Sequence, residues 1–216
     1  MTGADGPSRR TVLGAVGAAL AGVAGCVGDA GGGPTTDHPT DTLPAPTKGA
    51  PDAPVTVAAY EDFACPHCRT FALEVLPRLE SAYVDPGRVR YVHNDFPVPV
   101  HERWSWAAAV AARAVQAEAG DDAFFAYATR LYRRQGEYSL DTFGRQAEAV
   151  GVDGAVVRRA VERGRYRPTV AADRREGRQR DVPGTPTVFV GDRRLGGYSY
   201  GTVADAVETA IERRTT

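Results

Sequence analysis

The sequence predicts one α/β domain in which a β-α-β unit and a terminal β-β-α unit enclose a block of helices. Three observations carry this prediction. The β-branched runs at residues 55–60, 89–93 and 187–190 have the length of short strands. Residues 101–180 have helical spacing. The chain of 216 residues, with 43% hydrophobic and 25% charged residues, suits a soluble domain with additional sequence, and excludes a disordered or polytopic membrane protein.

Residues 1–25 have the pattern of an export signal. Arg9 and Arg10 precede an uncharged apolar run at residues 12–24, which is shorter than the ~20 residues that a membrane-spanning helix needs. A charged start, an apolar middle and a small-residue end are typical of a signal peptide that is removed. The twin arginine resembles the Tat signal, which exports folded proteins.

The signal is followed by a predicted attachment point and tether. Residues 23–26, Val-Ala-Gly-Cys, resemble a lipobox, in which Cys26 is lipidated and becomes the new N-terminus. The alternative is an ordinary cleavage site with an incidental cysteine. The following residues are rich in Gly, Pro, Thr and Asp and poor in apolar side chains, so we expect a flexible tether over 26–50 and the folded domain over 51–216.

The first half of the domain reads as a parallel β-α-β unit. After the strand at 55–60, residues 65–83 have helical spacing, and Pro77 predicts an irregularity within this helix. The apolar residues that recur on one helix face are Phe71, Val75, Leu79 and Tyr83. A turn at 85–87 leads to the strand at 89–93, and the short connections favour a right-handed crossover.

The remaining elements follow in order. Helices are predicted at residues 102–119, 123–134, 139–150, 153–163 and 169–180, with Ser139 and Asp153 as N-caps and Gly151 and Gly164 as stops. The strand at 187–190 turns back through residues 191–192 into a second strand at 193–196. An amphipathic helix at 203–213 closes the chain.

The motif Cys65-Pro66-His67-Cys68 lies where the first strand meets the first helix. Its spacing places the two sulfurs one helical turn apart, close enough for a short-loop disulfide. The first sulfur lies at a helix N-terminus, where unpaired amides favour the thiolate that attacks disulfides. His67 can add a positive charge or a donor, and Cys68, one turn inside, is the expected resolving thiol.

Two other uses of the pair stay open at this point. A purely structural disulfide would add little stability, because the loop is so short. A zinc or copper site would need further ligands from His67, His93 or His101, since the sequence has no second cysteine pair.

Two segments carry a family resemblance. Residues 63–68, Phe-Ala-Cys-Pro-His-Cys, and residues 182–187, Val-Pro-Gly-Thr-Pro-Thr, resemble the motifs of the DsbA-like branch of the thioredoxin superfamily, in the family's order. The resemblance extends from about residue 55 to residue 211. It implies a thioredoxin fold, with an inserted helical subdomain at about 101–180 that caps the active-site groove.

The resemblance also implies roles for individual residues. Cys65 would be the attacking cysteine, Cys68 its disulfide partner, and His67 a residue that helps to set the redox potential. Pro186 would be a cis-proline facing the disulfide. With Pro186, Thr185 would form the substrate-binding segment, its backbone pairing with an extended peptide.

One position departs from the family pattern. Many relatives carry a buried acid six residues before the first cysteine, where it accepts a proton from the second cysteine, and Ala59 occupies that position here. Glu61 and Asp62 are near, at or beyond the expected end of the strand. Proton transfer from Cys68 is therefore expected to use water or one of these two carboxylates.

The sequence thus predicts an exported thiol–disulfide oxidoreductase, held at the outer face of the membrane through lipid on Cys26. Its substrates would be cysteine-containing exported proteins, with oxidation preferred because that compartment favours disulfides. Reduction or isomerisation, and copper or zinc binding, are the alternatives. The enzyme would need a membrane redox partner but no external cofactor or metal. The net charge of −1 gives no sign of a nucleic-acid partner.

Overall fold

The computed structural model describes residues 42–98 and 101–215. The predicted signal peptide and Cys26 lie outside the described residues. Within the described ranges, no helix combines the length and the apolar character that crossing a membrane requires.

A five-stranded mixed sheet forms the centre of the domain, in the order β1-β3-β2-β4-β5. The strands are β1 (Thr47–Lys48), β2 (Val55–Glu61), β3 (Val89–Asp95), β4 (Thr187–Val190) and β5 (Arg193–Arg194). Strands β2 and β3 are parallel, whereas β4 is antiparallel to β2 and to β5. The predicted β-α-β and β-β-α units are therefore present and share one sheet.

The connection between β2 and β3 is helical from residue 66 to residue 84, with short turns on either side. The helical part consists of α1 (Pro66–Thr70), η1 (Phe71–Val75), α2 (Leu76–Leu79) and η2 (Glu80–Val84), where η1 and η2 are π-helical turns. The irregularity expected at Pro77 takes the form of the wide turn η1 just before it, since proline cannot donate to the carbonyl of the preceding turn.

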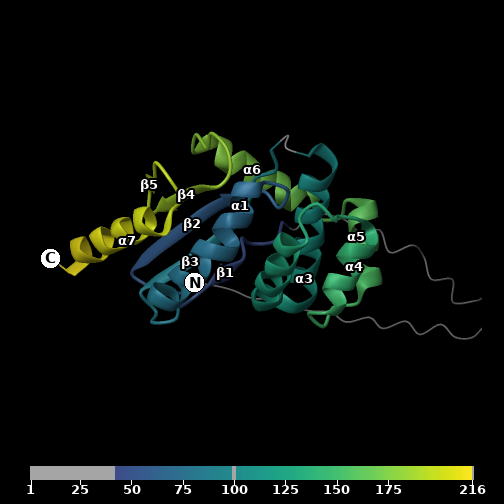
Figure 1. Ribbon diagram of the computed structural model, residues 1–216, viewed down its shortest axis with the longest axis horizontal. Helices are drawn as coiled ribbons and strands as arrows, with labels where there is room; N and C mark the ends of the chain where they lie inside the picture. The colour runs from purple at the N-terminus through teal and green to yellow at the C-terminus, as the bar shows by residue number, and fades with distance from the viewer. Residues whose placement is uncertain (1–41, 99–100, 216) are drawn as a thin grey trace, which may run out of the picture. The chain divides into compact units, whose positions relative to one another are not determined.

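The inserted helices are α3 (Glu102–Arg133), α4 (Leu140–Glu148), α5 (Gly154–Arg163) and α6 (Arg167–Gln179). Gly120 interrupts α3 with φ 81°, so the two predicted helices meet there in a break. Ser139 and Asp153 cap α4 and α5 as expected. Figure 1 shows α3, α4 and α5 gathered together, away from the C-terminal helix α7 (Tyr200–Thr215).

Helix α6 approaches the sheet closely through Gly177. A Cβ atom at this position would lie 2.6 Å from a ring carbon of Phe96 and 2.9 Å from a ring carbon of Tyr60. Both rings are buried, and they meet edge to face. The absence of a side chain thus lets the last inserted helix pack directly against the rings at the ends of β2 and β3.

The predicted tether over 26–50 is wrong at its C-terminal end. Thr47 and Lys48 form β1, which pairs antiparallel with β3 at the edge of the sheet. The Thr47 amide also donates to Asp121 of α3 over 2.9 Å. This segment has too few apolar side chains to predict a strand from its own sequence, and its order comes from the edge of β3 and from α3.

Candidate active site

The turn between β2 and α1 positions Cys65. The Cys65 amide donates to the Asp62 carbonyl over 3.0 Å, and the buried Asp62 carboxylate accepts from the Ala64 amide over 2.8 Å. Cys65 is then the N-cap of α1, with extended backbone, and Pro66 is the first helical residue. Pro66 suits this place because the first helical amide has no partner within the helix. The predicted strand–cysteine–helix junction is confirmed.

The structure brings the two motifs of the family resemblance together. The Cys65 thiol is 4% exposed and donates to the Thr185 carbonyl over 3.3 Å. The Thr185–Pro186 peptide is cis, as the resemblance implies. Cys65 and Cys68 are both free thiols, so the structure records the reduced form of the pair.

The two thiols differ strongly in acidity. The pKa of Cys65 is lowered from the ordinary 9.0 to about 5. The largest cause is a hydrogen bond from the Cys68 thiol, and burial acts in the opposite direction. The Thr185 side chain and the backbone amides of Cys68 and His67 lower the pKa further. Complete burial, the hydrogen bond to Cys65 and the charge of Glu61 raise the pKa of Cys68 well above 9.0. At neutral pH, Cys65 is therefore a thiolate and Cys68 a thiol.

The Thr185 hydroxyl is the side-chain part of this stabilisation. It is buried and has no hydrogen-bond partner in the recorded thiol state. A buried hydroxyl without a partner is unfavourable, and the Cys65 thiolate would supply the missing acceptor. Thr185 therefore serves Cys65 in both states, with its carbonyl as acceptor for the thiol and its hydroxyl as donor to the thiolate.

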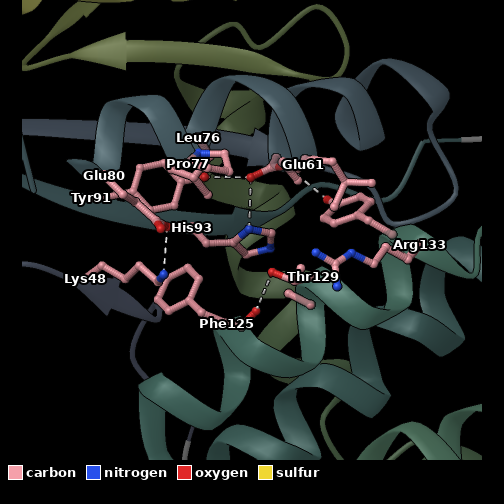
Figure 2. A pocket seen from close by; sticks show the side chains of 14 residues that line it. Lys48, Glu61, Leu76, Pro77, Glu80, Tyr91, His93, Phe125, Thr129 and Arg133 are labelled. Carbon is pink, nitrogen blue, oxygen red and sulfur yellow. Dashed lines mark hydrogen bonds and ion pairs between the residues drawn. The ribbon is translucent and has the colours of Figure 1, made fainter. Parts of the chain in front are cut away.

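Glu61 supplies a buried acid close to this pair. It is the last residue of β2, and its side chain is 1% exposed. Its carboxylate accepts from the hydroxyls of Tyr91 and Tyr132 over 2.7 and 3.0 Å and lies 3.2 Å from His93 Nδ1. Figure 2 shows the Glu61 carboxylate directed toward the His93 ring, in a cavity of about 80 Å³.

Glu61 lies on the same face of β2 as Ala59, because side chains alternate along a strand. Relative to the family pattern, the buried acid is thus present two residues closer to the cysteines, at Glu61 instead of at the position of Ala59. Asp62 has a different role: its amide donates to Cys68 Sγ over 3.4 Å, and its carboxylate accepts from backbone amides of the two adjoining loops. Of the two acids considered from the sequence, Glu61 is the one whose charge acts on Cys68.

The ring of His67 is held by a partner that the sequence did not predict. Its Nδ1 lies 2.9 Å from the hydroxyl of Tyr198, in the loop before α7. The Tyr198 ring also packs edge-on against the buried Phe71. The backbone amide of His67, rather than its ring, is the part that lowers the pKa of Cys65.

A pocket of about 330 Å³ opens beside Ala64, the residue that precedes Cys65. Its lining comes from the start of α3 and from the loop after it: His101, Trp104, Gln135, Gly136 and Tyr138. The Gln135 amide donates to the carbonyls of Phe63 and Cys65 over 2.8 and 2.9 Å. Local patterning gave no sign of Gln135, because it lies about 70 residues from the carbonyls that it supports.

The histidines proposed as alternative metal ligands face other partners. His93 lies between Glu61 and Asp95, and His101 accepts from the Trp104 amide at the start of α3. Among the described residues, no three His, Cys, Asp or Glu side chains are grouped as metal ligands. No observation in this part of the chain therefore favours the copper- or zinc-binding alternative.

Comparisons with known proteins agree with this geometry. The sequence model of a family described as thioredoxin matches residues 41–209. Disulfide bond formation protein D of Bacillus subtilis (strain 168) is 23% identical over 174 residues, 77% of this chain and 77% of that protein. The structure of oxidised BdbD from Bacillus subtilis matches with a TM-score of 0.74 and 22% identity, over 78% of this chain and 93% of that chain. Chlamydia trachomatis DsbA matches with a TM-score of 0.71 and 18% identity, over 82% and 98%.

Proposed function

The chain belongs to the DsbA-like family of thioredoxin-fold thiol–disulfide oxidoreductases, and from this premise we propose that it oxidises cysteine pairs in exported proteins. The Cys65–Cys68 disulfide would be passed to the substrate, leaving both cysteines reduced. The observation that carries the proposed direction is the acidity of Cys65, whose pKa is lowered to about 5.

The exchange proceeds in two steps. A substrate thiolate attacks the Cys65 sulfur of the disulfide; a mixed disulfide forms, and Cys68 leaves as a thiolate that takes up a proton, since its pKa is raised. A second substrate thiolate then attacks the mixed disulfide, which forms the substrate disulfide and releases Cys65 as a thiolate. Because the released Cys65 thiolate is stabilised, the reduced enzyme is favoured and its disulfide is an oxidant.

The substrate would lie across the segment of Thr185 and Pro186. The Thr185 carbonyl, which now accepts from Cys65, would pair with the backbone of an extended peptide once its cysteine reaches the sulfur. The pocket beside Ala64 is lined by Trp104 and Tyr138. It would receive an apolar side chain next to the substrate cysteine.

Glu61 would take the role that the acid at the position of Ala59 has in relatives. When a partner reoxidises the enzyme, Cys68 must lose its proton to attack a mixed disulfide at Cys65. The burial of Glu61 and the influence of its charge on Cys68 support it as the proton acceptor. The carboxylate would then return the proton to solvent through the adjoining cavity.

The proposed location rests on the N-terminal sequence. Arg9 and Arg10, the apolar run and Cys26 support export through the Tat route and attachment by lipid to the outer face of the membrane. Reoxidation would come from a membrane partner that accepts the two electrons. The pair itself would be the only redox group required.

Replacing Cys65 tests the proposed function directly. The Cys65→Ser chain should not oxidise a reduced, unfolded model protein, whereas the oxidised wild type should introduce disulfides into it. Cys26→Ser is the matched control, because it removes a cysteine but keeps the pair, and it should remain active. Undiminished oxidation by Cys65→Ser would refute the proposal.

A further inference from the structure

A chain of alternating charges leads away from the active site through the interior. Glu61 of β2 lies 3.2 Å from His93 Nδ1, and His93 Nε2 lies 3.3 Å from Asp95. Arg113 of α3 donates to Asp95 over 2.6 Å and forms a further ion pair with Asp173 of α6. All five side chains are buried or nearly so. The thioredoxin mechanism accounts for Glu61, but it gives the other four no role.

The geometry determines the charge of His93. Each of its ring nitrogens faces a carboxylate oxygen, Glu61 on one side and Asp95 on the other. A neutral imidazole has one nitrogen without a proton, and that nitrogen would repel a carboxylate; an imidazolium donates from both. Burial alone would lower the pKa of His93, but the hydrogen bonds and charges of Asp95 and Glu61 raise it to about 9.

His93 is the only cation among the three groups that contact the Glu61 carboxylate in the described part of the chain. The other two are the hydroxyls of Tyr91 and Tyr132, which stay neutral because burial raises the pKa of each well above 10. They hold the carboxylate in place, whereas His93 also balances its charge. The remaining ionisable groups that face this region are Cys68 from α1, Lys48 from β1, Glu80 from η2 and Arg133 from α3.

Arg113 keeps His93 available for Glu61. Without Arg113, the buried Asp95 carboxylate would have His93 as its only ion-pair partner and would draw the imidazolium towards itself. Arg113 is fully buried and balances Asp95 from the opposite side. His93, Asp95 and Arg113 are thus each held between two opposite charges, so His93 is held in place towards Glu61.

We propose that His93 is a positioning residue for the resolving step, in which its imidazolium holds Glu61 as the ionised acceptor of the Cys68 proton. In that step, Cys68 attacks the Cys65 sulfur of a mixed disulfide. The Cys65–Cys68 bond forms, the bond between Cys65 and the partner breaks, and the partner sulfur leaves as a thiolate. The Cys68 proton passes to Glu61. The pair is oxidised by two electrons and the partner's disulfide is reduced.

This inference rests on the proposed role of Glu61, but its test does not need a protein substrate. Reduced enzyme carrying Cys26→Ser is mixed with excess oxidised glutathione at several pH values. The reaction is stopped with acid, and the mass of the protein is measured by mass spectrometry. Formation of the glutathione adduct on Cys65 reports the first attack and depends on glutathione concentration. Loss of the adduct reports the attack by Cys68 and does not depend on it.

His93→Gln keeps hydrogen-bonding groups but removes the charge, and Tyr91→Phe is the matched control that removes one hydrogen bond to Glu61 without a change of charge. His93→Gln should slow the loss of the adduct about tenfold at neutral pH and move its pH profile upward, because the buried Glu61 carboxylate loses its cationic partner. Tyr91→Phe should move the profile less than His93→Gln, because the Glu61 carboxylate then keeps the imidazolium and the Tyr132 hydroxyl. Both should form the adduct at the wild-type rate.

A merely structural His93 would lower the melting temperature of His93→Gln but leave the pH profile on that of the wild type, and this result would overturn the proposal. Should His93→Gln not fold, the nitrogen NMR shifts of His93 in the reduced wild type decide: protons on both nitrogens at neutral pH support the proposal, and a neutral ring refutes it. Failure of the wild type to oxidise proteins, with the His93→Gln effect intact, would refute only the proposed function.

Discussion

Cys68→Ala should raise the pKa of Cys65 from about 5 to roughly 6–7. The hydrogen bond from Cys68 is the largest cause of the lowering of the Cys65 pKa from the ordinary 9.0 to about 5. A hydrogen bond to a charged group contributes about 1.5–3 kcal/mol, which equals about one to two pH units. The Thr185 hydroxyl and the helix amides remain in the variant, so the pKa should stay below 9.0.

The assay is a titration of the thiolate by its ultraviolet absorbance, in chains that also carry Cys26→Ser. Cys68 does not interfere in the wild type, because its pKa lies well above 9.0. Cys68→Ser is the matched control: its hydroxyl can still donate to Cys65, so its midpoint should remain within about half a unit of the wild-type value. If Cys68→Ala titrates together with this control, the thiol–thiolate hydrogen bond is not the origin of the acidity.

Four further results are expected. Thr185→Val removes the buried hydroxyl donor and should raise the pKa of Cys65 by about one unit in the same titration. The pKa of Cys65 is lower in the folded than in the unfolded chain. The thiolate's contribution to the stability of the reduced form should therefore be complete above about pH 9 and be lost as the pH falls to about 5. Urea unfolding of the reduced and oxidised forms at several pH values should show this difference. Arg113→Ala leaves the buried Asp173 carboxylate without its ion pair and Asp95 with His93 alone, and should lower the free energy of unfolding by about 3–5 kcal/mol in urea. Gly177→Ala should lower the melting temperature, because its Cβ would overlap the ring of Phe96. Wild-type stability in either of the last two variants would contradict the packing described here.

The elements nearest to the cysteines could be predicted because their signals are local. Cys65 and Cys68 are placed by a strand that is followed closely by a helix, and capping residues such as Ser139 predict where the inserted helices begin. The family resemblance added the contact between Cys65 and the segment of Thr185 and Pro186, which are 120 residues apart. Spacing within the sequence alone could not have shown that contact.

The parts that escaped prediction depend on distant partners. β1 is ordered by the edge of β3, not by apolar residues of its own. The sequence offers both Glu61 and Asp62 as proton acceptors and does not choose between them. The hydroxyls that hold the Glu61 carboxylate belong to Tyr91 and Tyr132, which are 30 and 71 residues away. The role of His93 likewise requires Asp95 to be balanced from α3. Such compensation of buried charge has no periodic signature in a sequence.

The reduction potential of the Cys65–Cys68 pair is the most direct test of the central claim, that the site favours the Cys65 thiolate and so makes the disulfide an oxidant. It can be measured by equilibrating the Cys26→Ser chain with glutathione buffers at neutral pH and quantifying both forms. We predict a value near about −120 mV, typical of a strong protein oxidant. A value near about −270 mV, typical of a reductant, would contradict the account.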